Sequence, residues 1–256
     1  MSATAERGRC QGMWQILRYN LRFYLITGAA ALLVAAPATW RLTPRWLFGP
    51  ALAFAAAIVG GSVWSLLVAH YIYDRSELFC WDWLRVRIAP PAHWTVLHAG
   101  LDEATPGLRR LFPGASGDVL DIYDPREMTE SSIARARQLT PLPEPARRAS
   151  AAELPIAAAT TDLVMLFFVA HELRRAAARE RLFAELIRIL RPGGQVVLVE
   201  HLRDAANVLA FGPGAWHFLP RQEWRRLAGR SGLTVRDECS LTPFVRAFFL
   251  VKTQGR

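Results

Sequence analysis

The chain has 256 residues, 52% of them hydrophobic, and a formal net charge of +9 that comes almost entirely from arginine. This length allows one domain of ordinary size and an additional segment. The basic residues form no dense cluster with interleaved aromatic residues, which argues against nucleic acid and favours a membrane surface. Cys10, Cys80 and Cys239 are too widely spaced for a disulfide framework or a zinc site, so we expect no metal.

Two long uncharged segments follow the basic N-terminal stretch, residues 1–22. The segments are 23–40 and 46–73, and a link of five residues separates them. A helix that crosses a membrane needs about 20 consecutive apolar residues. Residues 23–73 therefore predict a hairpin of two transmembrane helices.

Small and basic residues indicate how this hairpin is arranged. In the second helix, a small residue at every fourth position favours close approach of the first helix, at Ala53, Ala57 and Gly61. Arginines are more numerous before the hairpin than in its tip, which places the N-terminus and the C-terminal domain on the cytoplasmic side. We therefore expect a multi-pass membrane protein, with the lipid bilayer as one partner.

Two other interpretations of the hairpin are open. The tripeptide Ala36-Pro37-Ala38 resembles the cleavage site of a signal peptide, although removal there would leave the second apolar segment unexplained. The hairpin could also be buried inside a soluble protein. Against this, the 28 uncharged residues 46–73 are too many for an ordinary amphipathic helix.

A linker, residues 74–91, leads from the hairpin to the C-terminal domain. The linker residues Trp81, Trp83 and Leu84 fit either an amphipathic helix at the membrane interface or packing against the domain. Because Pro90-Pro91 ends the linker, the domain is expected to span residues 92–256.

Within this domain, short apolar runs alternate with helical patterns. Two uninterrupted apolar runs, 163–169 and 195–200, flank one amphipathic helix, which indicates a parallel β-α-β unit buried on both faces. Further strands are expected at 94–98, 119–123, 147–151, 233–239 and 246–252. The pattern predicts a doubly wound α/β sheet, and such sheets bind ligands at the carboxyl ends of their strands.

Three motifs occur in this domain in an order that one enzyme family shares. They are Ala152-Glu153-Leu154-Pro155, Leu190-Arg191-Pro192-Gly193-Gly194 before an apolar strand, and Phe218-Leu219-Pro220-Arg221-Gln222-Glu223-Trp224 followed by Ser231-Gly232-Leu233. In these motifs the chain resembles class I S-adenosylmethionine-dependent methyltransferases, of the methyltransferase type 11-like group. The resemblance covers about residues 94–252. It implies a Rossmann-like sheet of seven strands, S-adenosylmethionine as cofactor, and methyl transfer as activity.

The resemblance also implies where the cofactor binds. Residues 98–104 match the family's glycine-rich turn after the first strand, but only Gly100 is kept. Asp102 and Ala104 stand where the family has glycine, so their Cβ atoms would crowd the cofactor or restrict the backbone.

Four other residues complete the predicted cofactor site. Asp121 best matches the acidic residue that holds the ribose hydroxyls, with Asp124 as the alternative, because a carboxylate can accept two hydroxyl donors. Ser150 stands at the position that contacts adenine, where the family usually has Asp, and Glu153 follows it. Phe167 ends the fourth strand, where the reactive end of the cofactor would lie.

Polar pairs follow the two central strands, His171-Glu172 after one and Glu200-His201 after the other. Methyl transfer to oxygen or nitrogen needs a base, and a histidine oriented by a carboxylate is suited to that role. His217 lies in an apolar loop that in this fold often covers the acceptor. We therefore predict His171, His201 and His217 as catalytic residues; simple capping of strands and helices is the other interpretation.

The sequence thus favours a membrane-anchored methyltransferase that acts on a small molecule or lipid, such as one borne by the membrane itself. A second hypothesis is a non-catalytic binding or scaffold protein that has lost the cofactor, which the altered turn after the first strand supports. An NAD-dependent oxidoreductase is disfavoured, since Gly100 alone does not meet the G-x-G-x-x-G fingerprint.

Overall fold

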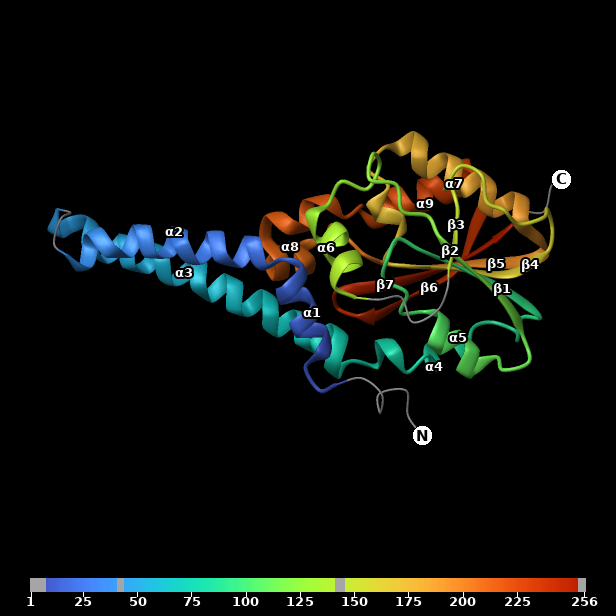
Figure 1. The fold of residues 1–256 in the computed structure, drawn as a ribbon, viewed down its shortest axis with the longest axis horizontal. Coiled ribbons are helices and arrows are strands. Elements are labelled where there is room, and N and C mark those ends of the chain that lie inside the picture. The colour runs from blue at the N-terminus through green and yellow to red at the C-terminus, as the bar shows by residue number, and fades with distance from the viewer. Residues whose placement is uncertain (1–7, 41–43, 141–145, 253–256) are drawn as a thin grey trace.

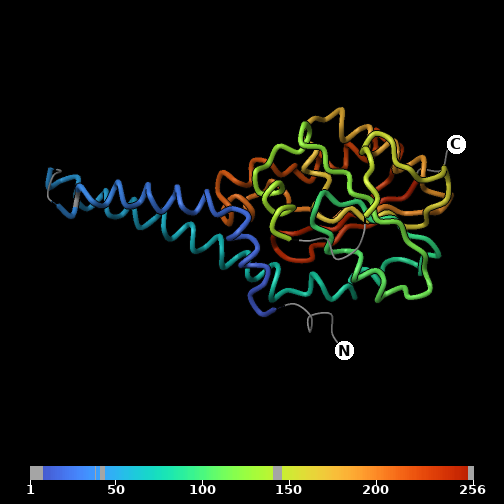
Figure 2. Tube along the Cα trace, in the orientation of Figure 1, coloured from blue at the N-terminus to red at the C-terminus, as the bar shows by residue number. Residues whose placement is uncertain are grey.

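A computed structural model describes residues 8–40, 44–140 and 146–252. Figure 1 shows a long arm of two helices that projects from a domain built around a central sheet. The arm consists of α2 (Leu21–Thr39) and α3 (Arg45–His70), and α1 (Gln11–Tyr19) lies across its base. The tube in Figure 2 shows that the chain runs out along α2, returns along α3 and passes directly into the domain.

The arm is apolar on its outer surface. One continuous helical stretch, Arg45–Phe79, is long and apolar enough to cross a membrane, and only 11% of its most apolar window is buried. The helices α1 and α2 pass the same test only as a pair, bent by 73°. The exposed residues of the arm include Phe23, Leu25, Ile26, Leu32, Leu33, Trp46, Phe54, Val63, Trp64 and Leu67. By length and composition, the described residues thus hold one candidate span, or two if the bent pair is one span.

The face of α3 that packs against α2 is not the expected one. The small residues predicted to face the partner helix are Ala53, Ala57 and Gly61. All three are exposed, so that prediction is wrong. Instead, Ala55 and Ser65 are buried. The Ser65 hydroxyl lies 3.1 Å from the hydroxyl of Tyr24 on α2, and Ser62 donates a hydrogen bond to Thr27. Polar side chains that pair between the helices therefore decide the register of the arm.

Seven strands form one mixed sheet in the order β3-β2-β1-β4-β5-β7-β6, which confirms the predicted Rossmann-like architecture. All neighbouring pairs are parallel except those of β7, which runs antiparallel to β5 and to β6. The strands are β1 (His93–His98), β2 (Ser116–Asp121), β3 (Arg147–Arg148), β4 (Thr161–Phe167), β5 (Leu190–His201), β6 (Leu233–Thr242) and β7 (Val245–Lys252).

Both faces of the sheet are covered because its central strands are apolar on both sides. Along β4, Val164 and Leu166 point into one core, and Leu163 and Met165 into the other. The first face carries α7 (Ala176–Ile189) and α9 (Arg221–Arg230), and the second carries α5 (Thr105–Leu111), as Figure 1 shows. The other helices are α4 (Asp82–Arg85), α6 (Ser131–Leu139), α8 (Ala205–Phe211), η2 (Tyr71–Arg75), η3 (Glu77–Phe79), η4 (Ala170–Glu172) and η5 (Gly212–His217).

The linker between arm and domain packs against the second face of the sheet. Leu78, Trp81 and Leu84 are buried in the same core as α5. The Trp81 ring lies 5.3 Å from the ring of Phe167, centroid to centroid. Of the two alternatives for this segment, packing against the domain is therefore the one that the structure contains.

Asp74 ties α1 to the base of the arm. Its carboxylate accepts the backbone N–H groups of Gly12 at 2.6 Å and Met13 at 3.0 Å, and it lies 2.9 Å from Nδ1 of His70. The Asp74 side chain has no exposed surface. At Gly12, a Cβ atom would collide with the side chain of Tyr73, so the close approach of α1 requires glycine.

We expect Asp74→Ala to lower the free energy of unfolding by about 1–3 kcal/mol, because buried N–H groups at the start of α1 would lose their acceptor. Chemical unfolding of the full chain in detergent micelles measures the change. Asp82→Ala is the control, since Asp82 pairs with Arg85 at the surface, where ion pairs contribute little. Equal stability of the two variants would contradict this role of Asp74.

Candidate active site

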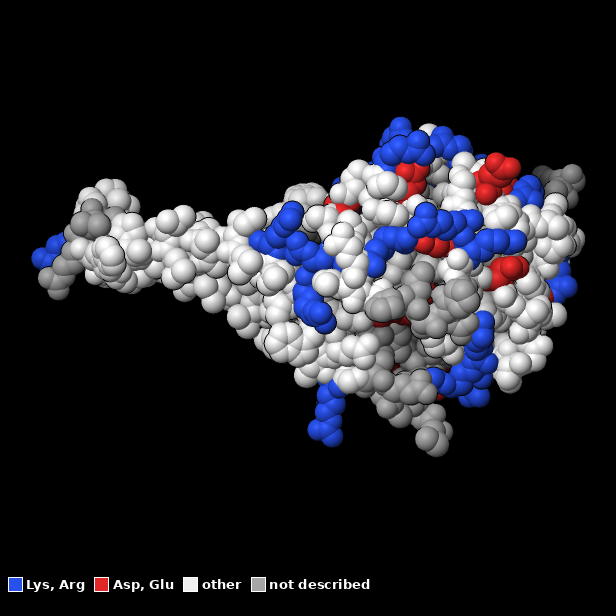
Figure 3. Space-filling model, viewed as in Figure 1, with Lys and Arg blue, Asp and Glu red and all other residues white. Residues whose placement is uncertain are grey.

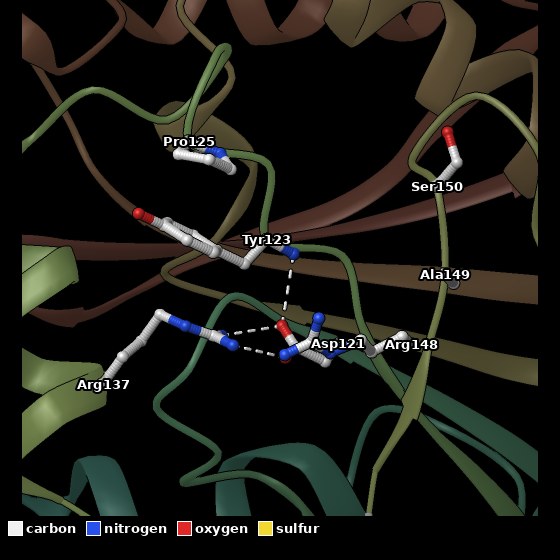
Figure 4. A pocket seen from close by; sticks show the side chains of 7 residues that line it. All are labelled: Asp121, Tyr123, Pro125, Arg137, Arg148, Ala149 and Ser150. Atoms are coloured by element: carbon white, nitrogen blue, oxygen red, sulfur yellow. Dashed lines mark hydrogen bonds and ion pairs between the residues drawn. The ribbon is translucent and has the colours of Figure 1, made fainter.

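The carboxyl ends of the parallel strands meet at the edge of the sheet that faces the arm (Figure 1). A cavity of about 520 Å³ opens there beside β2 and β3. The residues that line it are Asp121, Tyr123, Pro125, Arg137, Arg148, Ala149 and Ser150. Figure 4 shows that Asp121, Tyr123 and Arg137 converge on one side of this cavity, while Ser150 lies on the other. Its volume is in the range of small-molecule sites, about 300–1,000 Å³.

Arg137 of α6 occupies the part of the cavity next to Asp121. Its Nη1 and Nη2 atoms donate to Oδ1 and Oδ2 of Asp121 at 2.8 and 2.7 Å. The guanidinium carbon lies 4.3 Å from the centre of the Tyr123 ring, a cation–π distance. Burial opposes ionisation of Asp121, but the hydrogen bonds and charge of Arg137 outweigh it and lower the pKa of this carboxyl. Asp121 is therefore ionised and already paired.

The turn after β1 also contacts Arg137. Gly100 has a φ of +120°, and a Cβ atom there would collide with the side chain of Arg137, so only glycine fits. Next to it, Oδ1 of Asp102 accepts the backbone N–H groups of Ala104 and Thr105 at 3.1 and 3.0 Å. Asp102 thus caps the first turn of α5, which gives the departure from glycine a structural reason.

Two buried polar atoms of this turn have no partner among the described residues. One is Oδ2 of Asp102, and the other is Nε2 of His98. The Gly100 N–H donates to Nδ1 of His98 at 3.0 Å. Burial lowers the pKa of His98, so its ring is neutral and carries the proton on Nε2. The turn therefore offers one buried donor and one buried acceptor to a ligand.

These residues fit S-adenosylmethionine, the cofactor predicted from the sequence. Asp121 has three hydrogen bonds, from Arg137 and the N–H of Tyr123, and a carboxylate has about four acceptor positions. The remaining position can accept a ribose hydroxyl. The unpaired donor and acceptor of the turn after β1 suit the polar end of the cofactor, and the cavity is large enough for its nucleoside.

The structure brings three of the five predicted cofactor residues to this place. Asp121 and Ser150 line the cavity, and Gly100 contacts Arg137, which lines it too. Glu153 is exposed, and its backbone pairs with Ser150 without its side chain entering the lining. Phe167 also lies outside, because side chains alternate along β4 and this one points to the core beneath the linker. Neither Glu153 nor Phe167 is therefore among the residues that line the cavity, and their predicted contact with the cofactor stays a prediction.

A second group of side chains lies at the ends of β4 and β5, around a buried histidine. Nδ1 of His171 lies 2.6 Å from Oε2 of Glu200, and Nε2 lies 3.2 Å from Oε1 of Glu172. Burial alone would lower the pKa of His171, but the two carboxylates outweigh it and raise the pKa to about 10. At neutral pH, His171 is therefore an imidazolium with both nitrogens protonated, and it has no free position to accept a proton.

His201 is also fixed by two partners. Nδ1 donates to the carbonyl oxygen of Phe244 at 2.9 Å, so Nε2 is the acceptor for the hydroxyl of Tyr73 at 2.8 Å. Burial lowers the pKa of His201 to about 4, and the ring is neutral. The rings of Phe168 and Phe218 stack on it, at centroid distances of 4.8 and 5.0 Å. His201 thus joins the base of the arm to the site and positions the aromatic rings around it.

His217 of η5 is the most accessible of the three predicted catalytic histidines. Its ring stacks on His171 with centroids 5.6 Å apart and contacts Phe218 at 4.3 Å. Burial and then the charge of His171 lower the pKa of His217 to about 3. The ring is partly exposed, and neither nitrogen hydrogen-bonds to a described residue. The structure therefore gathers all three histidines around Phe218, and His217 is the one with a ring nitrogen available to an acceptor.

Sequence reasoning missed two residues of these two groups, Arg137 and Tyr73. Arg137 lies in a surface helix 16 positions after Asp121, and nothing in the pattern links the two. Tyr73 belongs to the segment assigned to the membrane hairpin, so no signal tied it to His201. Phe168 has a φ of +52°, unusual for phenylalanine, and this turn at the end of β4 places its ring on His201.

The fold of the domain has counterparts among known proteins. A family model described as a methyltransferase domain matches residues 124–198. An S-adenosylmethionine-dependent methyltransferase from Aquifex aeolicus is 16% identical over 70% of this chain and 94% of that one, with a TM-score of 0.51. The domain has the class I methyltransferase fold.

Two further methyltransferases resemble the chain over a longer range. Mitomycin 7-O-methyltransferase is 12% identical, over 98% of this chain and 74% of that one, with a TM-score of 0.56. Human N-acetylserotonin methyltransferase, solved with S-adenosylmethionine, is 14% identical over 94% of this chain and 70% of that one, with a TM-score of 0.54. No curated protein matches the sequence significantly. At these identities the likeness establishes the fold, and the family match begins just after Asp121.

The His171 imidazolium gives a pH test. The pKa of His171 is raised from about 6.5 in the unfolded chain to about 10. Its interaction with Glu172 and Glu200 therefore stabilises the fold fully below pH 6.5, and this contribution is lost as the pH rises towards 10. We expect the free energy of unfolding to fall over this range, with a slope of up to about 1.4 kcal/mol per pH unit from this group. In His171→Gln this contribution to the slope should be absent. Urea unfolding at a series of pH values measures the free energy of both proteins. If it depends on pH equally in both, His171 is not the charged partner of Glu172 and Glu200.

Arg137 and the cofactor compete for Asp121, which gives a binding test. We expect Arg137→Ala to lower the Kd for S-adenosylhomocysteine about tenfold, because the carboxylate becomes free for the ribose. Isothermal titration calorimetry measures the change. Arg126→Ala is the matched control, since Arg126 pairs with Asp124 outside the cavity and should leave binding unchanged. Weaker binding by Arg137→Ala would show that the arginine holds the ligand instead.

Proposed function

We propose that this chain is an S-adenosylmethionine-dependent methyltransferase that the α2–α3 arm anchors in a membrane. Its acceptor is a small molecule or lipid of that membrane, methylated on a hydroxyl or amine. One observation carries the proposal: the base of the apolar arm forms part of the candidate acceptor site, through the hydrogen bond from Tyr73 to His201. An arm that served only to tether the domain would have no need to reach the strand ends.

In the cofactor half, each residue has a separate task. S-adenosylmethionine, when bound, supplies a methyl group on a positively charged sulfur. Asp121 accepts a ribose hydroxyl, and Ser150 lies where the adenine is expected. Nε2–H of His98 and Oδ2 of Asp102 are free to hold the charged end of the molecule. Gly100 keeps the backbone close to the cavity.

In the acceptor half, the three histidines divide the work. His217 accepts the proton of the acceptor hydroxyl or amine at its free ring nitrogen. His171, as an imidazolium, cannot take that proton, and its ring supports His217 by stacking. His201 holds the aromatic rings that exclude water. With a pKa of about 3, His217 stays neutral across the physiological range and can accept the proton once positive charge develops on the attacking oxygen or nitrogen and makes that proton acidic.

The cofactor half has one feature that favours the second candidate function, a non-catalytic protein. The ion pair between Arg137 and Asp121 fills the position that a ribose would share. Titration of the full chain with S-adenosylmethionine decides between the two. If no binding is seen at millimolar cofactor, the non-catalytic function is the one that remains. If the cofactor binds and Asp121→Ala does not weaken this binding, Asp121 does not hold the ribose.

The catalytic proposal has a test of its own, with purified protein in detergent, S-adenosylmethionine labelled in its methyl group and an extract of membrane lipids. We expect label to enter the organic phase, and His217→Phe to lower this rate about 10²–10⁴-fold because the proton acceptor is lost. Phenylalanine keeps the ring contacts with His171 and Phe218. The KM for the cofactor should stay unchanged in His217→Phe. If this KM changes and the rate does not, His217 belongs to the cofactor half instead.

A further inference from the structure

The segment 205–217, which comprises α8 and η5, carries an apolar surface that the methyl-transfer site does not explain. It contains no charged residue. Three of its side chains are exposed although they are apolar: Val208 by 38%, Leu209 by 77% and Trp216 by 66%. Large apolar patches that stay exposed on a domain mark contact sites for other molecules or membranes.

This segment lies beside the base of the arm, as Figures 1 and 2 both show. The helix α8 contacts α3. A series of aromatic contacts continues from the arm to α8: the ring of Tyr71 lies 6.5 Å from Phe244, and Phe244 lies 6.5 Å from Phe211. The apolar surface of the arm therefore continues onto the domain without a polar break along these contacts.

The same segment covers the acceptor half of the candidate site. The ring of Phe211, at the end of α8, lies 5.7 Å from His201. His217, at the end of η5, carries the available ring nitrogen. The outer side of the segment is thus apolar and exposed, and its inner side contacts the histidines.

Basic residues gather around the base of the arm, next to the segment 205–217. Figure 3 shows Lys and Arg around the base of the arm and none along the visible middle of it. In sequence, the exposed arginines at the base are Arg9, Arg18, Arg22 and Arg75. Arginines next to an apolar span favour anionic lipid headgroups, and tryptophan favours the boundary between headgroups and acyl chains.

We propose that the segment 205–217 is a second membrane-contact surface, occupied by the lipid bilayer, through which an apolar acceptor reaches His217 directly from the lipid. This inference rests on the proposed membrane anchor. Leu209 and Trp216 enter the headgroup–acyl boundary, as the apolar face of an interfacial helix does. The acceptor then does not have to cross water, which favours apolar substrates with one ionisable head.

Spin labels on single cysteines test this arrangement in the full chain. Cys10, Cys80 and Cys239 are replaced by serine, and a label is placed by Leu209→Cys, Leu33→Cys or Ala158→Cys. The protein is reconstituted in vesicles of phosphatidylethanolamine and phosphatidylglycerol. Accessibility to oxygen, which concentrates in lipid, is compared with accessibility to a water-soluble nickel complex. Leu33 is exposed on the arm, and Ala158 is exposed in the loop before β4, at the far end of the domain.

We expect the Leu209 label to shift towards oxygen, as the Leu33 label does, and the Ala158 label to remain accessible to nickel. If the Leu33 label is in lipid and the Leu209 label is in water, the second contact surface is wrong and the anchor stands. If the Leu33 label is in water, the anchor and the surface both fail. A Leu209 label shielded from both reagents would assign the surface to a protein partner, such as a second copy of the chain, and would also overturn the proposal.

Discussion

A carboxylate without any exposed surface, Glu200, governs the arrangement at the carboxyl edge of the sheet. Burial of a charge is costly unless a cation and hydrogen bonds accompany it. Glu200 obtains both from one place, since the N–H groups of Ala170 and His171 donate to Oε1 and the His171 ring binds Oε2. This set of bonds fixes η4, and η4 fixes the ring on which His217 stacks. The group of side chains around His171 is therefore built outward from one buried charge.

The arm and the domain are connected by more than the covalent chain. Asp74 holds α1 against the start of the linker, and Tyr73, the adjacent residue, reaches His201. The linker then places Trp81 under β4. A displacement of the arm would therefore be transmitted to the aromatic rings of the site within a few residues. This coupling is the physical reason for relating the apolar arm to the chemistry of the domain.

The sequence predicted the fold well, because its strands are apolar on both faces and turns punctuate them. It also predicted that the histidines at the ends of β4 and β5 lie together, since parallel strands bring their carboxyl ends to one edge. It could not predict the protonation of His171, which depends on two carboxylates converging in space, or the pairing of Arg137 with Asp121 across the cavity. For α3 the period of small residues was misleading, because hydroxyl partners on α2 decided which face packs.

The departure of the turn after β1 from the glycine-rich pattern is less severe in structure than in sequence. Asp102 replaces a glycine, but one oxygen caps α5 and the other remains unpaired beside His98. Further along the edge, Glu172 and Glu200 flank the His171 imidazolium, and Arg174 lies 4.0 Å from Glu172. Asp121 and Arg137 pair with each other. The unpaired carboxylate oxygen of Asp102 suits a cationic ligand, so the altered turn is compatible with S-adenosylmethionine.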